Sequence, residues 1–97
     1  MILIRVEMRG VAPDDARFAQ ACEQLNLAGF SRTVSRLDGT RFKLPAAEFR
    51  FAGDASVGLE SARDLAAAAI RPIHEDFGVL AMQVQEWTSL GLKVKVP

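Results

Sequence analysis

The segment over residues 29–51 constrains the fold more than any other part of the chain. Gly29 suits the positive φ that ends many helices, and the pair Asp38-Gly39 suits a tight reversal between two strands. The segment therefore predicts the end of a helix, then two strands whose connection ends or bends at Leu44-Pro45. The segment is also basic, with Arg32, Arg36, Arg41, Lys43 and Arg50 against Asp38 and Glu48. This local excess of cations indicates a polyanionic partner.

The overall composition limits the class of protein. The chain has 97 residues, of which 49% are hydrophobic and 25% are charged, and this predicts one domain over residues 1–97. Its formal net charge is zero, so any nucleic-acid site must be a local patch. Its single cysteine excludes an internal disulfide, and we find no pattern of a signal peptide or a membrane span. These features favour the cytoplasm.

Alternation and helix signals place the first two elements. Residues 2–8 alternate between two faces with the period of a strand that has one buried side. Residues 13–15, Pro-Asp-Asp, are typical of a helix start, because proline has no amide hydrogen to leave unpaired and acids are favourable at that end. We expect this first helix to end at Gly29 and the side chains of Phe49 and Phe51 to enter the core.

The second half of the chain predicts a helix and a strand. Ser56 is a favourable N-cap for a helix whose apolar side chains recur at three- and four-residue steps. Pro72 removes a backbone hydrogen bond, so we expect this helix to stop or loosen near Arg71. After Gly78, alternation predicts a strand that carries Leu80, Met82 and Val84 on one side and Ala81, Gln83 and Gln85 on the other. Residues 93–96 add a short terminal strand.

The predicted order is strand, helix, strand, strand, helix, strand. This is the βαββαβ arrangement of an α+β, ferredoxin-like domain, in which two helices cover one face of a four-stranded antiparallel sheet. We expect the other face to stay open and to carry charged side chains. The expected set is Leu3, Arg5, Glu7, Arg9, Arg32, Arg36, Glu48, Arg50, Gln83 and Gln85.

Several short motifs also follow one another in a recognisable order over nearly the whole chain. They are the acid Glu7 after the first strand's apolar residues, Gly-Phe-Ser-Arg at 29–32, Asp-Gly at 38–39, Leu-Pro at 44–45 and Glu-Phe at 48–49. In this pattern the chain resembles the GhoS-type antitoxin endoribonucleases. The resemblance implies a ferredoxin-like fold related to the small CRISPR-associated nucleases, and action on messenger RNA in a toxin–antitoxin system. It also implies an acid at Glu7 and basic positions at Arg32, Arg36 and Arg41.

The candidate catalytic residues are Glu7 and Arg36. Glu7 would accept a proton from an attacking 2′-hydroxyl or hold a hydrated Mg²⁺, while Arg36 would stabilise charge on the phosphate. The alternative is that Glu7 pairs with a neighbouring arginine across the sheet. The candidate RNA-binding residues are Arg5, Arg9, Arg32, Arg41, Lys43 and Arg50, with Phe42 either as a stacking surface for an unpaired base or as a residue of the core. The alternative for these cations is a role in solubility and in protecting sheet edges.

Three further residues have simpler interpretations. Histidine is a common acid or base in RNA cleavage, but His74 has no second histidine beside it, so we expect it at the surface or at a helix end. Cys22 lies on the apolar stripe of the first helix and is expected to pack inertly. Trp87 is expected to anchor the core or an interface. The sequence contains no phosphate loop, no zinc ligand set and no serine nucleophile motif, and it identifies no cofactor.

Two functional interpretations remain open from the sequence. The first is a cytoplasmic RNA-binding protein that resembles an antitoxin endoribonuclease, with single-stranded RNA, including a toxin's messenger RNA, as its partner. The second is a non-catalytic dimerisation or regulatory module, in which the sheet and residues 93–96 form a protein interface. A homodimer is compatible with either, and neither has a membrane partner.

Overall fold

The alternating residues Ile2–Met8 form β1, which lies inside the main sheet and organises it. In the computed structural model, which describes residues 1–95, Ile4 and Val6 are buried while Arg5 and Glu7 are exposed. β1 pairs with β5 (Glu48–Phe51) on one side and with β6 (Phe77–Gln83) on the other. The short β2 (Phe30–Ser31) pairs with β5, so the order is β2-β5-β1-β6 with every pair antiparallel. The strand predicted at residues 2–8 is confirmed.

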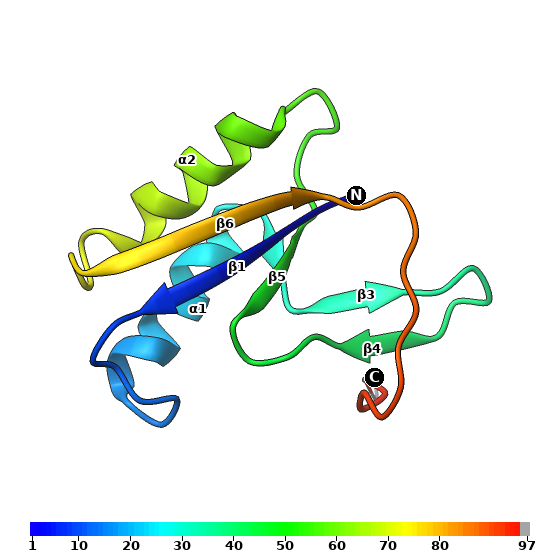
Figure 1. Ribbon diagram of the computed structural model, residues 1–97, viewed down its shortest axis with the longest axis horizontal. Coiled ribbons are helices and arrows are strands. Elements are labelled where there is room, and N and C mark those ends of the chain that lie inside the picture. Colours follow the sequence, from blue (N-terminus) through cyan, green and yellow to red (C-terminus); the bar gives the residue numbers. More distant parts are fainter. Residues whose placement is uncertain (96–97) are drawn as a thin grey trace.

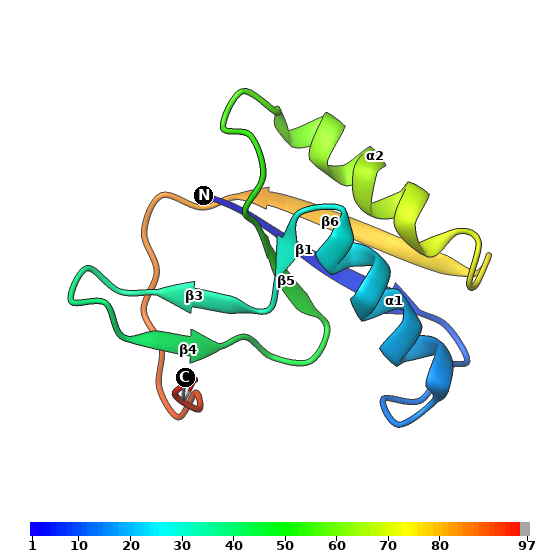
Figure 2. The ribbon, with the colours of Figure 1, turned by 180° about the vertical axis from the view of Figure 1, so that it is seen from behind.

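Two helices lie on the same side of this sheet (Figures 1 and 2). They are α1 (Ala16–Leu27) and α2 (Leu59–Ile70). The core between the helices and the sheet contains Ile4, Val6, Met8, Ala21, Leu25, Phe30, Phe49, Ala66 and Ile70, with Phe51 packed against it. The protein is therefore α+β, with two helices and a four-stranded antiparallel sheet, and this is compatible with a ferredoxin-like arrangement. Neither helix of the described chain is long and apolar enough to cross a membrane.

The ends of α1 follow the sequence signals. Asp15 is the N-cap, and its carboxylate accepts a hydrogen bond from the backbone N–H of Arg17 at 2.8 Å. Beyond the last turn, Gly29 has φ +101°, a conformation that costs other residues more than glycine. The predicted start at residues 13–15 and the predicted end at Gly29 are both confirmed.

The N-cap of Asp15 makes the stability of the protein depend on acid pH. Hydrogen bonds from the side chain and backbone of Arg17 lower the pKa of Asp15 from 3.8 to about 2. Because the folded pKa lies below the unfolded one, the stabilisation is complete above the unfolded value and is lost as the pH falls towards 2. We expect the difference in unfolding free energy between the wild type and Asp15→Asn, measured by urea denaturation, to shrink over this range. A difference that stays constant down to the folded pKa would contradict the role of this carboxylate.

The helix α2 begins later than predicted and ends where expected. Gly58 occupies the N-cap position without a side-chain bond, and the backbone N–H of Ser56 instead donates to Asp54 at 2.8 Å. The prediction of Ser56 as N-cap is therefore wrong, because a local turn with Asp54 uses this residue first. The helix ends at Ile70 just before Pro72, so the predicted stop near Arg71 is confirmed.

The two strands predicted within residues 29–51 are each divided between two sheets. The reversal at Asp38-Gly39 forms as expected, with Gly39 at φ +89°. It joins β3 (Thr33–Ser35) to β4 (Arg41–Lys43), which pair in a separate two-stranded sheet. Only β2 and β5 enter the main sheet, which corrects the expected arrangement of one strand on each side of the turn. The division has a physical reason at the second boundary, because Pro45 has no N–H to continue a ladder from β4 to β5.

The two faces of β6 are the reverse of those that the sequence predicts. Leu80 pairs with Arg5 and Met82 pairs with Leu3, so these two apolar residues of β6 lie on the open face. Gln83 pairs with Ile2 instead, and Gln85 lies beyond the strand. The prediction that both glutamines join the open face is wrong. The alternate residues Phe77, Val79 and Ala81 pack against the core instead. The reason is that a change of one residue in the register of a strand exchanges its two faces.

The chain after β6 passes beside the two-stranded sheet (Figure 1). Val94 forms a bridge with Phe42, and β4 and residues 93–95 exchange two backbone hydrogen bonds. These run from Lys43 N to Lys93 O and from Lys95 N to Arg41 O, each 2.8 Å long. The terminal strand predicted at residues 93–96 thus corresponds to a short extension of β4's sheet, and Val96 lies outside the described residues.

Candidate nucleic-acid interface

β3, β4 and residues 93–95 form an extended element that we call the cationic ribbon. In its register Ser35 lies opposite Arg41 and Thr33 lies opposite Lys43. The backbone bonds around the Phe42–Val94 bridge place Lys95 opposite Arg41 and Lys93 opposite Lys43. Because residues opposite each other share a face, one face of the ribbon carries four cations. We call this the cationic face, made of Arg41, Lys43, Lys93 and Lys95.

The cationic face is electrostatically uncompensated within residues 1–95. All four side chains are exposed, and the ion pairs of the described chain involve Arg5, Arg9, Arg17 and Arg63 instead. Two like-charged pairs face each other directly across neighbouring strands, which destabilises the ribbon. A bound polyanion would remove this repulsion, so the face is suited to a phosphate chain.

Thr33 connects the ribbon to the main sheet. Only 5% of this residue is exposed, and its hydroxyl contacts that of Ser31 at 3.0 Å. Arg41 donates to the same hydroxyl at 3.3 Å, while Arg50 on β5 donates from Nε to the backbone carbonyl of Thr33 at 3.0 Å. Arg50 is therefore held beside the cationic face, and it extends the basic surface towards the main sheet.

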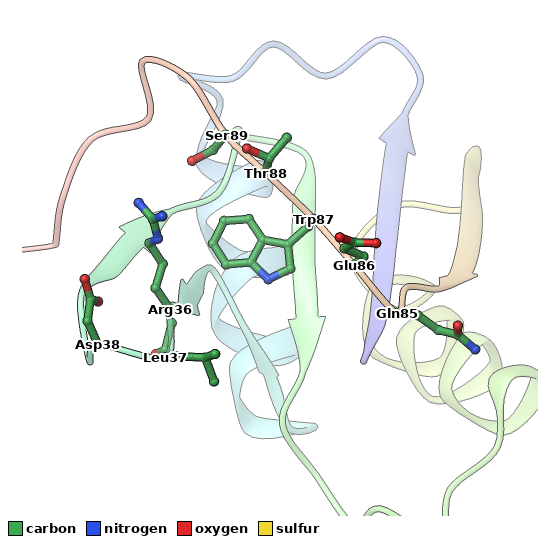
Figure 3. Close-up of a pocket in the computed structure, with 9 residues that line it drawn as sticks. Arg36, Leu37, Asp38, Gln85, Glu86, Trp87, Thr88 and Ser89 are labelled. Atoms are coloured by element: carbon green, nitrogen blue, oxygen red, sulfur yellow. The ribbon is translucent and has the colours of Figure 1, made fainter.

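A groove of about 610 Å³ lies between the tip of the β3–β4 hairpin and residues 85–89 (Figure 3). In this view the indole of Trp87 extends towards Arg36 and Leu37 of the hairpin, whereas Gln85 and Glu86 point away from it. The guanidinium carbon of Arg36 lies 6.0 Å from the centre of the Phe42 ring, on the face of the ribbon opposite the cationic face. Phe42 is half-buried there, so it is not an open stacking surface, and this agrees with the alternative that it packs against the protein.

A second groove of about 300 Å³ adjoins the first and shares Trp87 with it. It lies over the start of β1, where residues from the hairpin and from the chain after β6 meet the open face. Its lining includes Met1, Leu3, Val34, Leu44, Leu90 and Leu92. This part of the open face is therefore bordered by other elements, and the face is less free than the sequence predicted.

The two candidate catalytic residues are not brought together. Glu7 lies near the end of β1 opposite Gly78, while Arg36 lies near the tip of the β3–β4 hairpin, on the other side of the molecule (Figure 1). The carboxylate of Glu7 is 3.4 Å from the Arg9 guanidinium, and both side chains are exposed. This contact matches the alternative of an arginine partner, although the partner lies in the turn just after β1 and not across the sheet.

Arg5 on β1 and Arg9 in the turn just after it are engaged in local contacts. Arg5 pairs with Glu48 of the neighbouring strand β5. Arg9 pairs with Asp76 at 2.7 Å and donates to the backbone carbonyl of Phe77 at 3.0 Å, and the hydrogen bond to Asp76 is the main cause of its raised pKa. Both cations are thus partly neutralised where they lie, in contrast to those of the cationic face.

Arg32 lies on the helix side of the sheet, and its prediction as part of the open face is wrong. Its guanidinium carbon is 5.8 Å from the centre of the Phe18 ring and 5.6 Å from that of Phe49, and its Nη1 is 3.8 Å from the sulfur of Cys22. The Nε atom is buried without a hydrogen-bond partner among the described residues. The reason is its place between β2 and β3, where alternation directs it to the same side as Phe30. Burial raises the pKa of the Cys22 thiol, which is consistent with inert packing.

His74 has a structural position at the end of α2. Its Nδ1 is 3.5 Å from Nη1 of Arg17, which has only hydrogens to donate, so Nδ1 is the acceptor. Its Nε2 then donates to the backbone carbonyl of Arg9 at 2.7 Å. His74 therefore links the ends of β1 and α2 to the start of α1. No group of three His, Cys, Asp or Glu side chains within residues 1–95 is placed to hold a metal ion.

The sequence prediction did not include two residues of the cationic face, Lys93 and Lys95, among its candidate binding residues. The signal was present, because the alternation in residues 93–96 repeats that of Arg41-Phe42-Lys43. What the sequence lacked was the pairing of these two distant segments. Comparison with known proteins adds no further assignment, since no protein-family model, curated protein or solved structure matches this chain.

Proposed function

We propose that this protein binds single-stranded RNA, with the phosphate chain lying along the cationic face. The observation that carries the proposal is that cations face each other twice across neighbouring strands of that face. Arg41 lies opposite Lys95, and Lys43 lies opposite Lys93. A surface built only for solubility would gain nothing from placing four cations in mutual repulsion on one face. Arg50 adds a fifth positive charge beside them. The narrow ribbon suits one strand better than a duplex, whose recognition uses wider surfaces.

The salt dependence of binding tests this proposal. Four phosphate contacts to a single strand predict a slope of about −3 for the logarithm of the association constant against the logarithm of the salt concentration. The measurement is fluorescence anisotropy with a short end-labelled RNA at several concentrations of NaCl. A slope near zero, or no binding at low salt, would end the proposal. A matched duplex of the same length serves as the comparison and is expected to bind more weakly.

Cleavage of RNA, in a toxin–antitoxin system or elsewhere, stays a prediction that depends on the resemblance. The separation of Glu7 from Arg36 gives no support to a mechanism in which both act on one phosphate within a single subunit. The proposed RNA binding does not need either residue, and its test does not depend on cleavage. The cytoplasmic location and a toxin messenger RNA as the target are likewise predictions.

The alternative of a dimerisation module has one favourable observation, the outer edge of β6. The seven residues Phe77–Gln83 contain no charged side chain, and no strand within residues 1–95 pairs with their outer edge. Leu80 is 55% exposed there. Edge strands that stay monomeric usually carry charges or proline, so a second copy could extend the sheet at this edge. Light scattering of the protein in solution decides between one copy and two.

A further inference from the structure

The groove between the hairpin tip and residues 85–89 lies next to the cationic ribbon along the chain and in space. Ser35 and Arg36 line this groove, and Ser35 lies directly opposite Arg41 of the cationic face. Arg36, by contrast, lies over Phe42 on the opposite face of the ribbon. A strand whose phosphates follow the cationic face therefore reaches the groove by passing Ser35 and turning around the hairpin tip. Its volume of about 610 Å³ lies within the usual range of sites for small organic molecules.

We propose that this groove takes an unpaired base of the bound RNA, stacked on the indole of Trp87. The inference rests on the proposed RNA binding. It assigns a base of the RNA to the groove, which the phosphate contacts of the cationic face do not use. Trp87 is half-buried and extends across the groove towards Arg36 and Leu37 (Figure 3). Aromatic side chains beside a basic track are how many proteins hold single strands, because every base has a face that stacks.

The charges of the groove favour a base over a phosphate. Arg36 contributes one positive charge, whereas Asp38 and Glu86 contribute two negative ones. The pKa of Asp38 is lowered by its hydrogen bond from the backbone of Thr40, so the carboxylate is charged at neutral pH. A groove without excess positive charge does not compete with the cationic face for phosphates. Its hydroxyl and carboxylate groups can instead accept or donate hydrogen bonds at the edge of a base.

The exposed apolar surface beside the groove also fits this occupant. Leu37 at the hairpin tip is fully exposed to water. It lines the groove together with Trp87. A flat base seated against the indole would cover part of both apolar side chains, and this adds a hydrophobic contribution to the stacking.

The fluorescence of Trp87 is a direct reporter for this contact, because Trp87 is the only tryptophan of the chain and the chain contains no tyrosine. The test compares a short single-stranded RNA with an abasic ribose-phosphate strand of equal length and charge. RNA is expected to change the fluorescence of Trp87 and to bind roughly tenfold more tightly than the abasic strand. The abasic strand should bind without the fluorescence change.

Variants separate this inference from the proposed function. Trp87→Ala is expected to lower RNA affinity to that of the abasic strand and to leave the salt slope near its wild-type value, whereas Trp87→Phe retains most of the difference. Equal affinity of the wild type for the two strands, with unchanged fluorescence and a slope of about −3, would overturn the groove assignment and leave the RNA-binding proposal standing. Failure of both strands to bind would overturn both. The wild-type comparison needs no variant, so a Trp87→Ala protein that does not fold does not weaken the test.

Discussion

Replacing all four residues of the cationic face with glutamine is expected to weaken binding of single-stranded RNA by about a hundredfold. Each exposed pairing of a cation with a phosphate contributes up to about 1 kcal/mol, and about 1.4 kcal/mol corresponds to a factor of ten. The salt slope should fall towards zero in the same variant, because the counterions released on binding scale with the number of contacts. Fluorescence anisotropy measures both quantities.

The same variant is expected to be slightly more stable than the wild type, by about 0.5 kcal/mol, because two like-charged pairs are removed from adjacent strands. Urea denaturation measures this change. The two results have opposite signs, and a variant that merely misfolds cannot produce both. The matched control is Arg63→Gln with Arg71→Gln, since both residues are exposed on or next to α2 and away from the ribbon. If the control loses as much affinity per charge removed, the binding is not located on the cationic face.

The second large effect is expected at Phe49, in the centre of the core. Its side chain is 1% exposed, and it packs beneath α1 and beside the guanidinium of Arg32. Phe49→Ala is expected to lower the free energy of unfolding by about 3–5 kcal/mol, through lost burial and the cavity that remains. For a domain of this size the midpoint of thermal unfolding should fall by more than about 10 °C. Arg32 would also lose one of the two rings that hold it on the helix side.

Two comparisons make this prediction specific. Phe49→Leu keeps an apolar side chain in the site and should cost much less than the alanine variant. Leu37→Ala changes a fully exposed residue and should stay within about 0.5 kcal/mol of the wild type. If Phe49→Ala lowers the free energy of unfolding by less than about 1 kcal/mol, Phe49 does not belong to the core between the helices and the sheet.

Local patterns in the sequence were sufficient where one segment decides its own structure. The alternation of residues 2–8 predicts β1, and the signals at residues 13–15, Gly29 and Pro72 predict the ends of both helices to within a turn. In each case the deciding interaction is between near neighbours, such as the bond from Arg17 N to the Asp15 carboxylate. The pair Asp38-Gly39 also forms its reversal, because a turn depends only on its own backbone angles.

Predictions failed where the partner of a segment had to be known. Both faces of β6 carry apolar residues, so the alternation of Leu80 and Met82 does not show which face of β6 is turned towards the core. The pairing of β6 with β1 decides this. The sequence predicts Arg32 on the open face, but the rings of Phe18 and Phe49 provide a site for it on the helix side. The separation of Glu7 from Arg36 was also not readable from the sequence, since nothing local sets the distance between β1 and the hairpin of the second sheet.

The sequence by itself determined the type and limits of most elements, and the local basic excess that pointed to a phosphate chain. Only the tertiary structure decided which cations act together. Lys93 and Lys95 join Arg41 and Lys43 through two backbone hydrogen bonds between segments about half the chain apart. The physical reason is that backbone pairing between distant strands does not depend on side-chain identity, so the composition of a segment does not reveal its partner.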